Sequence, residues 1–199
     1  MNISDTIKSA VKGMPSLVTG GQPGYRAGDD KLAWFRPELS APPTISIRSE
    51  AFEDGSPIPF RYSADGDNQP PPLSWSGLPE GTRSLALIVE DPDAPTPEPF
   101  VHWLLYGISP AMKNLSAAGE RSAAGGAMQG KNSTMKTGWT GMAPPKGDTP
   151  HRYFFQLFAL DTPLMLEPGI GRTALMDAMA GHVIARGRLL GTYQRSKDA

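Results

Sequence analysis

The stretch Ser84-Leu85-Ala86-Leu87-Ile88-Val89-Glu90-Asp91-Pro92-Asp93-Ala94-Pro95 decides the fold of this chain. Residues 84–89 form a continuous apolar run of strand length, which is typical of a strand buried on both faces. A carboxylate-rich turn shaped by two prolines follows at once. Burying titratable groups costs free energy unless they are paired or used, so the end of this strand indicates that a polar group is held there.

The strand pattern repeats at intervals on both sides of this stretch. Candidate strands lie at residues 44–47, 60–62, 100–108, 153–160 and 183–193. The connections between them mostly lack a helical pattern, which favours antiparallel sheets over a parallel, doubly wound one. One helix is predicted at residues 173–180, where strong helix formers precede Gly181 and place Leu175, Met176 and Met179 toward the core. We therefore predict a mainly β fold, an antiparallel β-sandwich with one C-terminal helix and a short N-terminal helix.

The short N-terminal helix is predicted at residues 2–12, where Ile3, Ile7 and Val11 stand four apart. A helix of this length is marginal alone, so its apolar face must be covered by its own domain or by a second chain. We expect a homodimer on this ground.

Residues 13–43 carry glycines, prolines and few periodic apolar positions. They are interpreted as a linker or an extended wrap with Trp34 and Phe35 as anchors. The predicted organisation is an N-terminal extension at residues 1–43 and a single domain at residues 44–195.

Charge and composition exclude several classes of function. Lysine and arginine number 19 against 20 acidic residues, and the net charge of −1 gives no bulk attraction to nucleic acid or to an anionic membrane. The absence of cysteine excludes disulfides, thiolate metal sites and cysteine nucleophiles. Neither a signal-peptide core nor the run of about 20 apolar residues of a membrane helix is present. We expect a cytoplasmic protein that neither binds nucleic acid nor inserts stably into a membrane.

The polar residues around the strand ends suggest three kinds of site, of which the first, a serine hydrolase, is discounted. Ser74 and Ser76 lack the strand-turn-helix frame of a serine hydrolase. A metal site could be built from His102, His151 and Asp91, since two histidines and one carboxylate suit non-haem iron. The third reading is an anion pocket, in which histidines, a tyrosine hydroxyl and backbone amides donate to phosphate oxygens. A carboxylate beside a histidine would stabilise the imidazolium and orient the ring.

Collinear motifs connect these residues to a known family. They are Pro57-Ile58-Pro59-Phe60-Arg61-Tyr62, Asp65-Gly66-Asp67-Asn68, Pro71-Pro72-Leu73-Ser74-Trp75, Glu90-Asp91-Pro92-Asp93-Ala94-Pro95, Val101-His102-Trp103, Gly130-Lys131-Asn132, Pro144-Pro145-Lys146-Gly147-Asp148, Pro150-His151-Arg152-Tyr153 and Gly191-Thr192-Tyr193. In these motifs the chain resembles the phosphatidylethanolamine-binding protein family, also called Raf kinase inhibitor-like proteins, in its bacterial branch.

This resemblance implies an antiparallel β-sandwich with a small anion-binding pocket at one end and no cofactor. The ligand-binding residues that it implies are Asp91, Pro95, His102, Ala143 through its backbone, Pro145, His151 and Tyr153. The sequence departs from the usual pattern at Ser133, Trp139 and Met142-Ala143, which leaves the pocket width and ligand choice open.

Two function classes follow from the resemblance and the residues. The first, which we favour, is non-catalytic binding of phosphate or a phosphoethanolamine-like anion, with regulation or inhibition of a kinase or protease partner. The second is a hydrolase acting on a phosphorylated small molecule, with or without a metal. We predict that the protein is not an enzyme, because the sequence shows no activated nucleophile.

Overall fold

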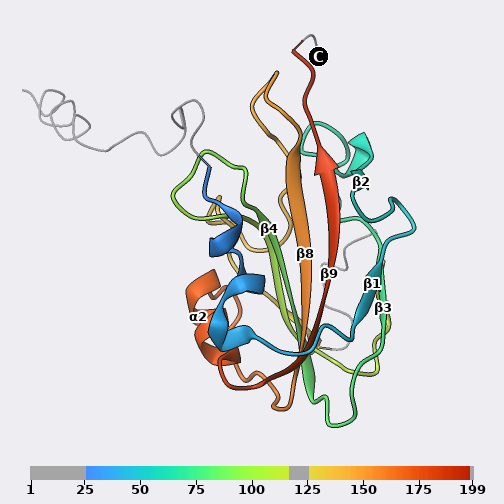
Figure 1. Cartoon of the computed structure of the whole chain (residues 1–199), viewed down its shortest axis with the longest axis vertical. Helices are drawn as coiled ribbons and strands as arrows, with labels where there is room; N and C mark the ends of the chain where they lie inside the picture. Colours follow the sequence, from blue (N-terminus) through green and yellow to red (C-terminus); the bar gives the residue numbers. More distant parts are fainter. Residues whose placement is uncertain (1–25, 117–125, 198–199) are drawn as a thin grey trace, which may run out of the picture.

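The computed structural model describes residues 26–116 and 126–197. Within these ranges the chain forms two open sheets, one α-helix and short 3-10 helices (Figure 1). The six-stranded sheet has the order β2 (Ser56–Pro57), β9 (Val183–Tyr193), β8 (His151–Leu160), β4 (Ser84–Asp91), β5 (Phe100–Ile108) and β7 (Met128–Gln129). The three-stranded sheet has the order β1 (Ser46–Arg48), β3 (Leu73–Ser76) and β6 (Asn114–Leu115). The helices are η1 (Asp29–Lys31), η2 (Ala33–Phe35), η3 (Pro37–Leu39), η4 (Phe60–Tyr62) and α2 (Arg172–Met179). The helix predicted at residues 2–12 lies outside the described residues, so the homodimer that it would mediate stays a prediction.

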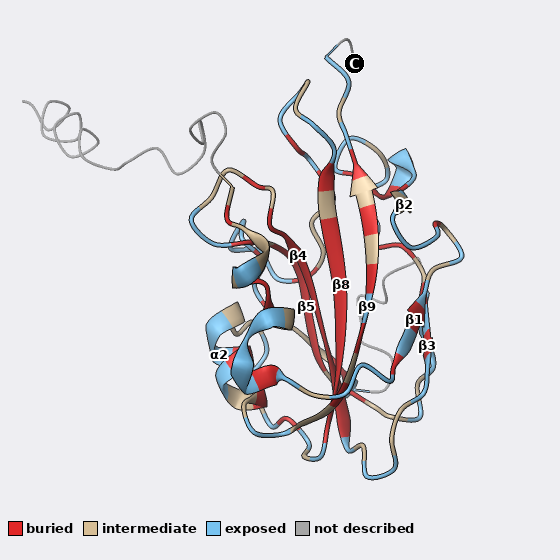
Figure 2. Cartoon of the chain, viewed as in Figure 1, coloured by how far each residue is buried: buried red, intermediate tan, exposed pale blue. Residues whose placement is uncertain are grey.

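The long strands of the large sheet are apolar on both faces because both faces are covered. Buried residues run along β4, β5 and β8 (Figure 2), and two separate hydrophobic clusters lie on opposite sides of these strands. Neighbouring strands pair antiparallel with one exception, β2 and β9, which run parallel. The predicted purely antiparallel arrangement is therefore wrong at this edge of the sheet, where the β2 contact spans only two residues.

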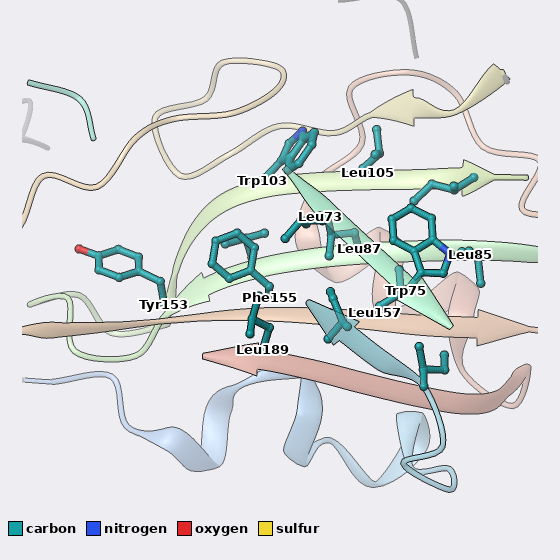
Figure 3. Packing of buried hydrophobic residues seen from close by; sticks show 14 of the residues in the cluster. Leu73, Trp75, Leu85, Leu87, Trp103, Leu105, Tyr153, Phe155, Leu157 and Leu189 are labelled. Carbon is teal, nitrogen blue, oxygen red and sulfur yellow. The ribbon is translucent and has the colours of Figure 1, made fainter. Parts of the chain in front are cut away.

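The small sheet covers one face. In β3, Leu73 and Trp75 are buried and the intervening serines are exposed, as expected for a strand with one buried face. Leu73 and Trp75 pack with Leu87, Phe155 and other side chains of the large sheet in one cluster, which Figure 3 shows. The core between the two sheets follows from this two-residue alternation.

The opposite face is covered by η1 to η3 and by α2, which lie together on that side of the large sheet (Figure 1). The predicted anchors of the N-terminal wrap are only half correct. Phe35 is 48% exposed, and the residues that are buried are Leu32, Ala33 and Leu39. Trp34 is half-buried, with the Arg186 guanidinium 4.2 Å from its ring centroid. The 3-10 turns point small and aliphatic side chains at the sheet and leave the Phe35 ring exposed.

Two further segments test the expected elements. The segment at 60–62 is the 3-10 turn η4, which follows Pro59, and is not a strand as predicted. The predicted C-terminal helix is confirmed as α2, with Leu175, Met176 and Met179 buried. Gly181, just beyond it, has a φ of +79°, the left-handed conformation that commonly ends helices. None of the described helices is long and apolar enough to cross a membrane.

A buried carboxylate joins the covering layer to the sheet. The Glu90 side chain is fully buried on the face opposite the small sheet. Its Oε2 accepts hydrogen bonds from the backbone N–H of Ala33 at 2.9 Å and from Gln156 Nε2 at 2.8 Å. Arg172, at the start of α2, donates from Nε to the other carboxylate oxygen. One charged group thus fixes η2, β8 and α2 relative to β4.

We predict that Arg172→Met lowers the free energy of unfolding by about 3–5 kcal/mol at neutral pH, because it leaves the Glu90 carboxylate buried without its cation. Urea unfolding measures this loss. Arg36→Met is the matched control, because Arg36 pairs with Glu38 at 2.9 Å on the surface and should cost less than about 1 kcal/mol. Equal, small losses in both variants would contradict a structural role for the buried pair.

Candidate functional site

His102 is aimed into the core between the sheets by a β-bulge. Along the β4–β5 ladder, Val89 pairs with Trp103 and Glu90 pairs with Val101, so His102 is the extra residue of β5. Bulges of this kind redirect a side chain and are common beside functional sites. The backbone of His102 accepts a hydrogen bond from Thr140 N at 2.9 Å, and its ring Nδ1 lies 2.7 Å from Thr140 O. The bulge therefore fixes both the direction and the rotation of this ring.

Asp91 and His151 form a buried pair at the adjoining ends of β4 and β8. His151 Nδ1 lies 2.8 Å from Asp91 Oδ2, and both side chains are at most 4% exposed. The other oxygen of Asp91 accepts the N–H groups of Asp93 and Ala94, at 2.8 and 3.1 Å. The turn after β4 is thereby wrapped around the carboxylate, which holds the imidazole in one orientation.

The outer nitrogen of His151 contacts a second carboxylate. His151 Nε2 lies 3.3 Å from Asp148 Oδ2, and Asp148 in turn accepts Arg26 Nη2 at 2.9 and 2.8 Å on its two oxygens. Only the imidazolium can donate from both nitrogens at once. Burial disfavours that charge, but hydrogen bonds and charge from Asp91 and Asp148 outweigh it, so the pKa of His151 is raised.

His102 has the opposite electrostatics. Burial lowers the pKa of His102 and prevails over the charge of Asp91, so this ring is neutral at neutral pH. Its Nδ1–H is committed to the carbonyl of Thr140, which leaves Nε2 as a hydrogen-bond acceptor. The two histidines were expected to donate together, but their pKa values shift in opposite directions. Only the surroundings of His151 favour the protonated ring.

Two hydrogen-bond donors beside His102 are buried without a partner. The Tyr153 ring meets the His102 ring edge-on, with 5.1 Å between the ring centroids. The centroid of the Trp139 ring lies 6.2 Å from that of His102. The Tyr153 hydroxyl and Trp139 Nε1 both lack a hydrogen-bond partner, a costly condition for buried polar atoms. Tyr153 lies at one end of the core cluster, with its hydroxyl pointing away from the other labelled side chains (Figure 3). Burial, then the charge of Asp91, raises the pKa of Tyr153, which keeps its proton available for donation.

The remaining predicted residues lie on the flanking loops. Pro95 is half-buried in the loop after β4, and Ala143 and Pro145 are exposed in the loop before β8. Their part in the site stays a prediction. The structure thus brings Asp91, His102, His151 and Tyr153 together from three strands, all of them at most 3% exposed.

A surface hollow adjoins this cluster. It has a volume of about 490 Å³ and is lined by Phe60, Asp65, Lys146, Tyr193, Gln194, Arg195 and Ser196. Tyr193 is the residue of β9 that pairs with His151 across the sheet. The hollow therefore begins next to the buried histidine, although the histidine itself does not line it.

Sequence reasoning did not name four residues as members of the site. Two of them could have been found from the sequence, since Trp139 departs from the family pattern and Asp148 stands three residues before His151. Arg26 and Thr140 had none, because only the folded chain brings them to the site. Among the described residues, no group of three or more histidine, aspartate or glutamate side chains is arranged to hold a metal ion. Both nitrogens of His151 face carboxylates, which does not suit the alternative metal triad with His102 and Asp91.

Comparison with known proteins places the chain in a family. The model of the phosphatidylethanolamine-binding protein family matches residues 48–194. A relative named UPF0098 protein from Methanothermobacter thermautotrophicus is 43% identical over 155 residues, which are 76% of this chain and 99% of the relative. Among solved structures, a phosphatidylethanolamine-binding protein homolog from Chlamydia trachomatis is 40% identical with a TM-score of 0.71. E. coli YbcL is 32% identical with a TM-score of 0.69. Each covers 76% of this chain and 98% of the compared chain. The chain therefore belongs to the phosphatidylethanolamine-binding protein family.

Proposed function

We propose that the protein binds a small phosphate-bearing anion, without turning it over, at the cluster of Asp91, His102, His151 and Tyr153. The observation that carries this proposal is the buried pair of His151 and Asp91, in a cluster with His102, beside which the buried Tyr153 hydroxyl and Trp139 Nε1 lack hydrogen-bond partners. Buried donors without partners are costly in an isolated domain, and an anionic oxygen ligand would satisfy them.

The mixture of donors and acceptors indicates the form of the ligand. Tyr153 and Trp139 donate, His151 donates with a positive charge, and His102 Nε2 accepts. A singly charged phosphate monoester has oxygens that accept and one hydroxyl that donates, and the inorganic phosphate monoanion has two such hydroxyls, so either complements this set better than a fully ionised group would.

The hollow beside Tyr193 gives room for the rest of such a ligand. Its lining combines the aromatic rings of Phe60 and Tyr193 with the charged ends of Lys146, Asp65 and Arg195. A headgroup larger than phosphate, such as phosphoethanolamine, would extend into this space. Regulation of a kinase or protease partner through the same site stays a prediction.

The first test is calorimetric titration with inorganic phosphate and with phosphoethanolamine. His151→Ala should weaken binding of both by roughly 1.5–3 kcal/mol, the size of a charge-assisted hydrogen bond. His182→Ala is the matched control, because His182 is also paired with an aspartate, Asp161, at 2.9 Å but is 47% exposed. The control should bind as the wild type does, and a chelator should change neither result.

Equal affinity in wild type and His151→Ala would reject this site. Binding that disappears with the chelator would support the metal reading, and release of phosphate from phosphoethanolamine would support the hydrolase.

The second test uses pH. Because the pKa of His151 is raised, its imidazolium persists above the usual histidine range, and it is lost only as pH rises through that raised value. Affinity for methyl sulfate, a singly charged oxyanion whose charge is constant over this range, should be steady at lower pH and fall as His151 deprotonates. Titration of the His151 ring by NMR in the same samples gives the reference midpoint. A methyl sulfate affinity that ignores this midpoint would show that the charge of His151 does not hold the anion.

A further inference from the structure

His151 has a buried side and a solvent side. On the buried side, Asp91 is 4% exposed and lies 2.8 Å from Nδ1. On the solvent side, Asp148 is 25% exposed and lies 3.3 Å from Nε2. The second distance is long for a hydrogen bond between charged groups, so Asp148 is the weaker and more easily replaced of the two partners.

Asp148 also occupies the position that an incoming anion needs. Its carboxylate stands between the imidazolium of His151 and the guanidinium of Arg26. Partial burial opposes ionisation there, but His151, the N–H of Thr149 and Arg26 together lower the pKa of Asp148. An ionised carboxylate therefore fills the outer face of the one buried cation in the cluster.

The loop that carries Asp148 contacts both His151 and residues that line the hollow. Gln194 Nε2 donates to the backbone carbonyl of Asp148 at 2.7 Å, and Gly147 N donates to Arg195 O at 3.1 Å. Lys146 of the same loop lines the hollow.

We infer that Asp148 is a built-in competitor of the ligand, an affinity-determining residue whose carboxylate must leave His151 before an external oxyanion binds there. This inference rests on the proposed function. It also narrows the ligand, since the position accepts an anionic oxygen flanked by an imidazolium and a guanidinium. Repulsion by the nearby carboxylates of Asp91 and Asp148 favours a singly charged group over a doubly charged one.

The test compares phosphate binding by the wild type and Asp148→Asn at a pH well below the His151 midpoint. Asparagine keeps the shape and the acceptor for Thr149 but removes the competing charge, so affinity for inorganic phosphate should rise by roughly tenfold, the scale of one charge-assisted hydrogen bond. The His151 midpoint measured by NMR should fall at the same time, because one of its two carboxylates is gone. Asp148→Ala should likewise raise the affinity for phosphate and lower the His151 midpoint.

Asp161→Asn is the matched control, because it removes an aspartate paired with the exposed His182 and changes the net charge by the same amount. It should leave both phosphate affinity and the His151 midpoint unchanged. If the wild type binds phosphate and Asp148→Asn binds no more tightly, the competitor role is wrong while the anion site stands. If neither protein binds phosphate, the anion site itself is wrong and the competitor role falls with it.

Discussion

The structure depends on two adjacent carboxylates buried at the end of one strand. Glu90 and Asp91 follow the apolar run of β4, and their side chains are 0% and 3% exposed. Successive side chains of a strand point to opposite faces, so one carboxylate lies on each side of the large sheet. A buried charge is tolerated only when it is paired and hydrogen-bonded, and each of these two recruits its own set of partners.

The partners on the two faces serve different purposes. On one face, Glu90 holds Ala33, Gln156 and Arg172, and so attaches the 3-10 turns and α2 to the sheet. On the other, Asp91 holds His151 and the turn that follows β4. The partners of Glu90 and those of Asp91 are thereby separated by the large sheet.

Charge balance governs what the site can do. The cluster is not an open positive pocket, because His151 is matched by carboxylates on both nitrogens and His102 is neutral. Under the proposed function, an external anion would have to replace one of the internal carboxylates. Membership in the family shows the fold, and one fold can carry different functions, so the ligand must be argued from the site itself.

The sequence by itself determined the four long strands β4, β5, β8 and β9, the C-terminal helix and the motifs that carry Asp91, His102, His151 and Tyr153, but it missed β3. These features follow from local apolar runs, helix propensity and short spacings, which need no knowledge of distant residues. Only the tertiary structure decided that His102 is a bulge residue, that Arg26 reaches Asp148 from 122 positions away, and that Glu90 is paired with Arg172. The pairing of buried charges depends on which segments the folded sheet brings together, and the pKa directions of the two histidines depend on that pairing. A linear pattern shows which residues can carry charge, but burial and neighbours decide which of them does.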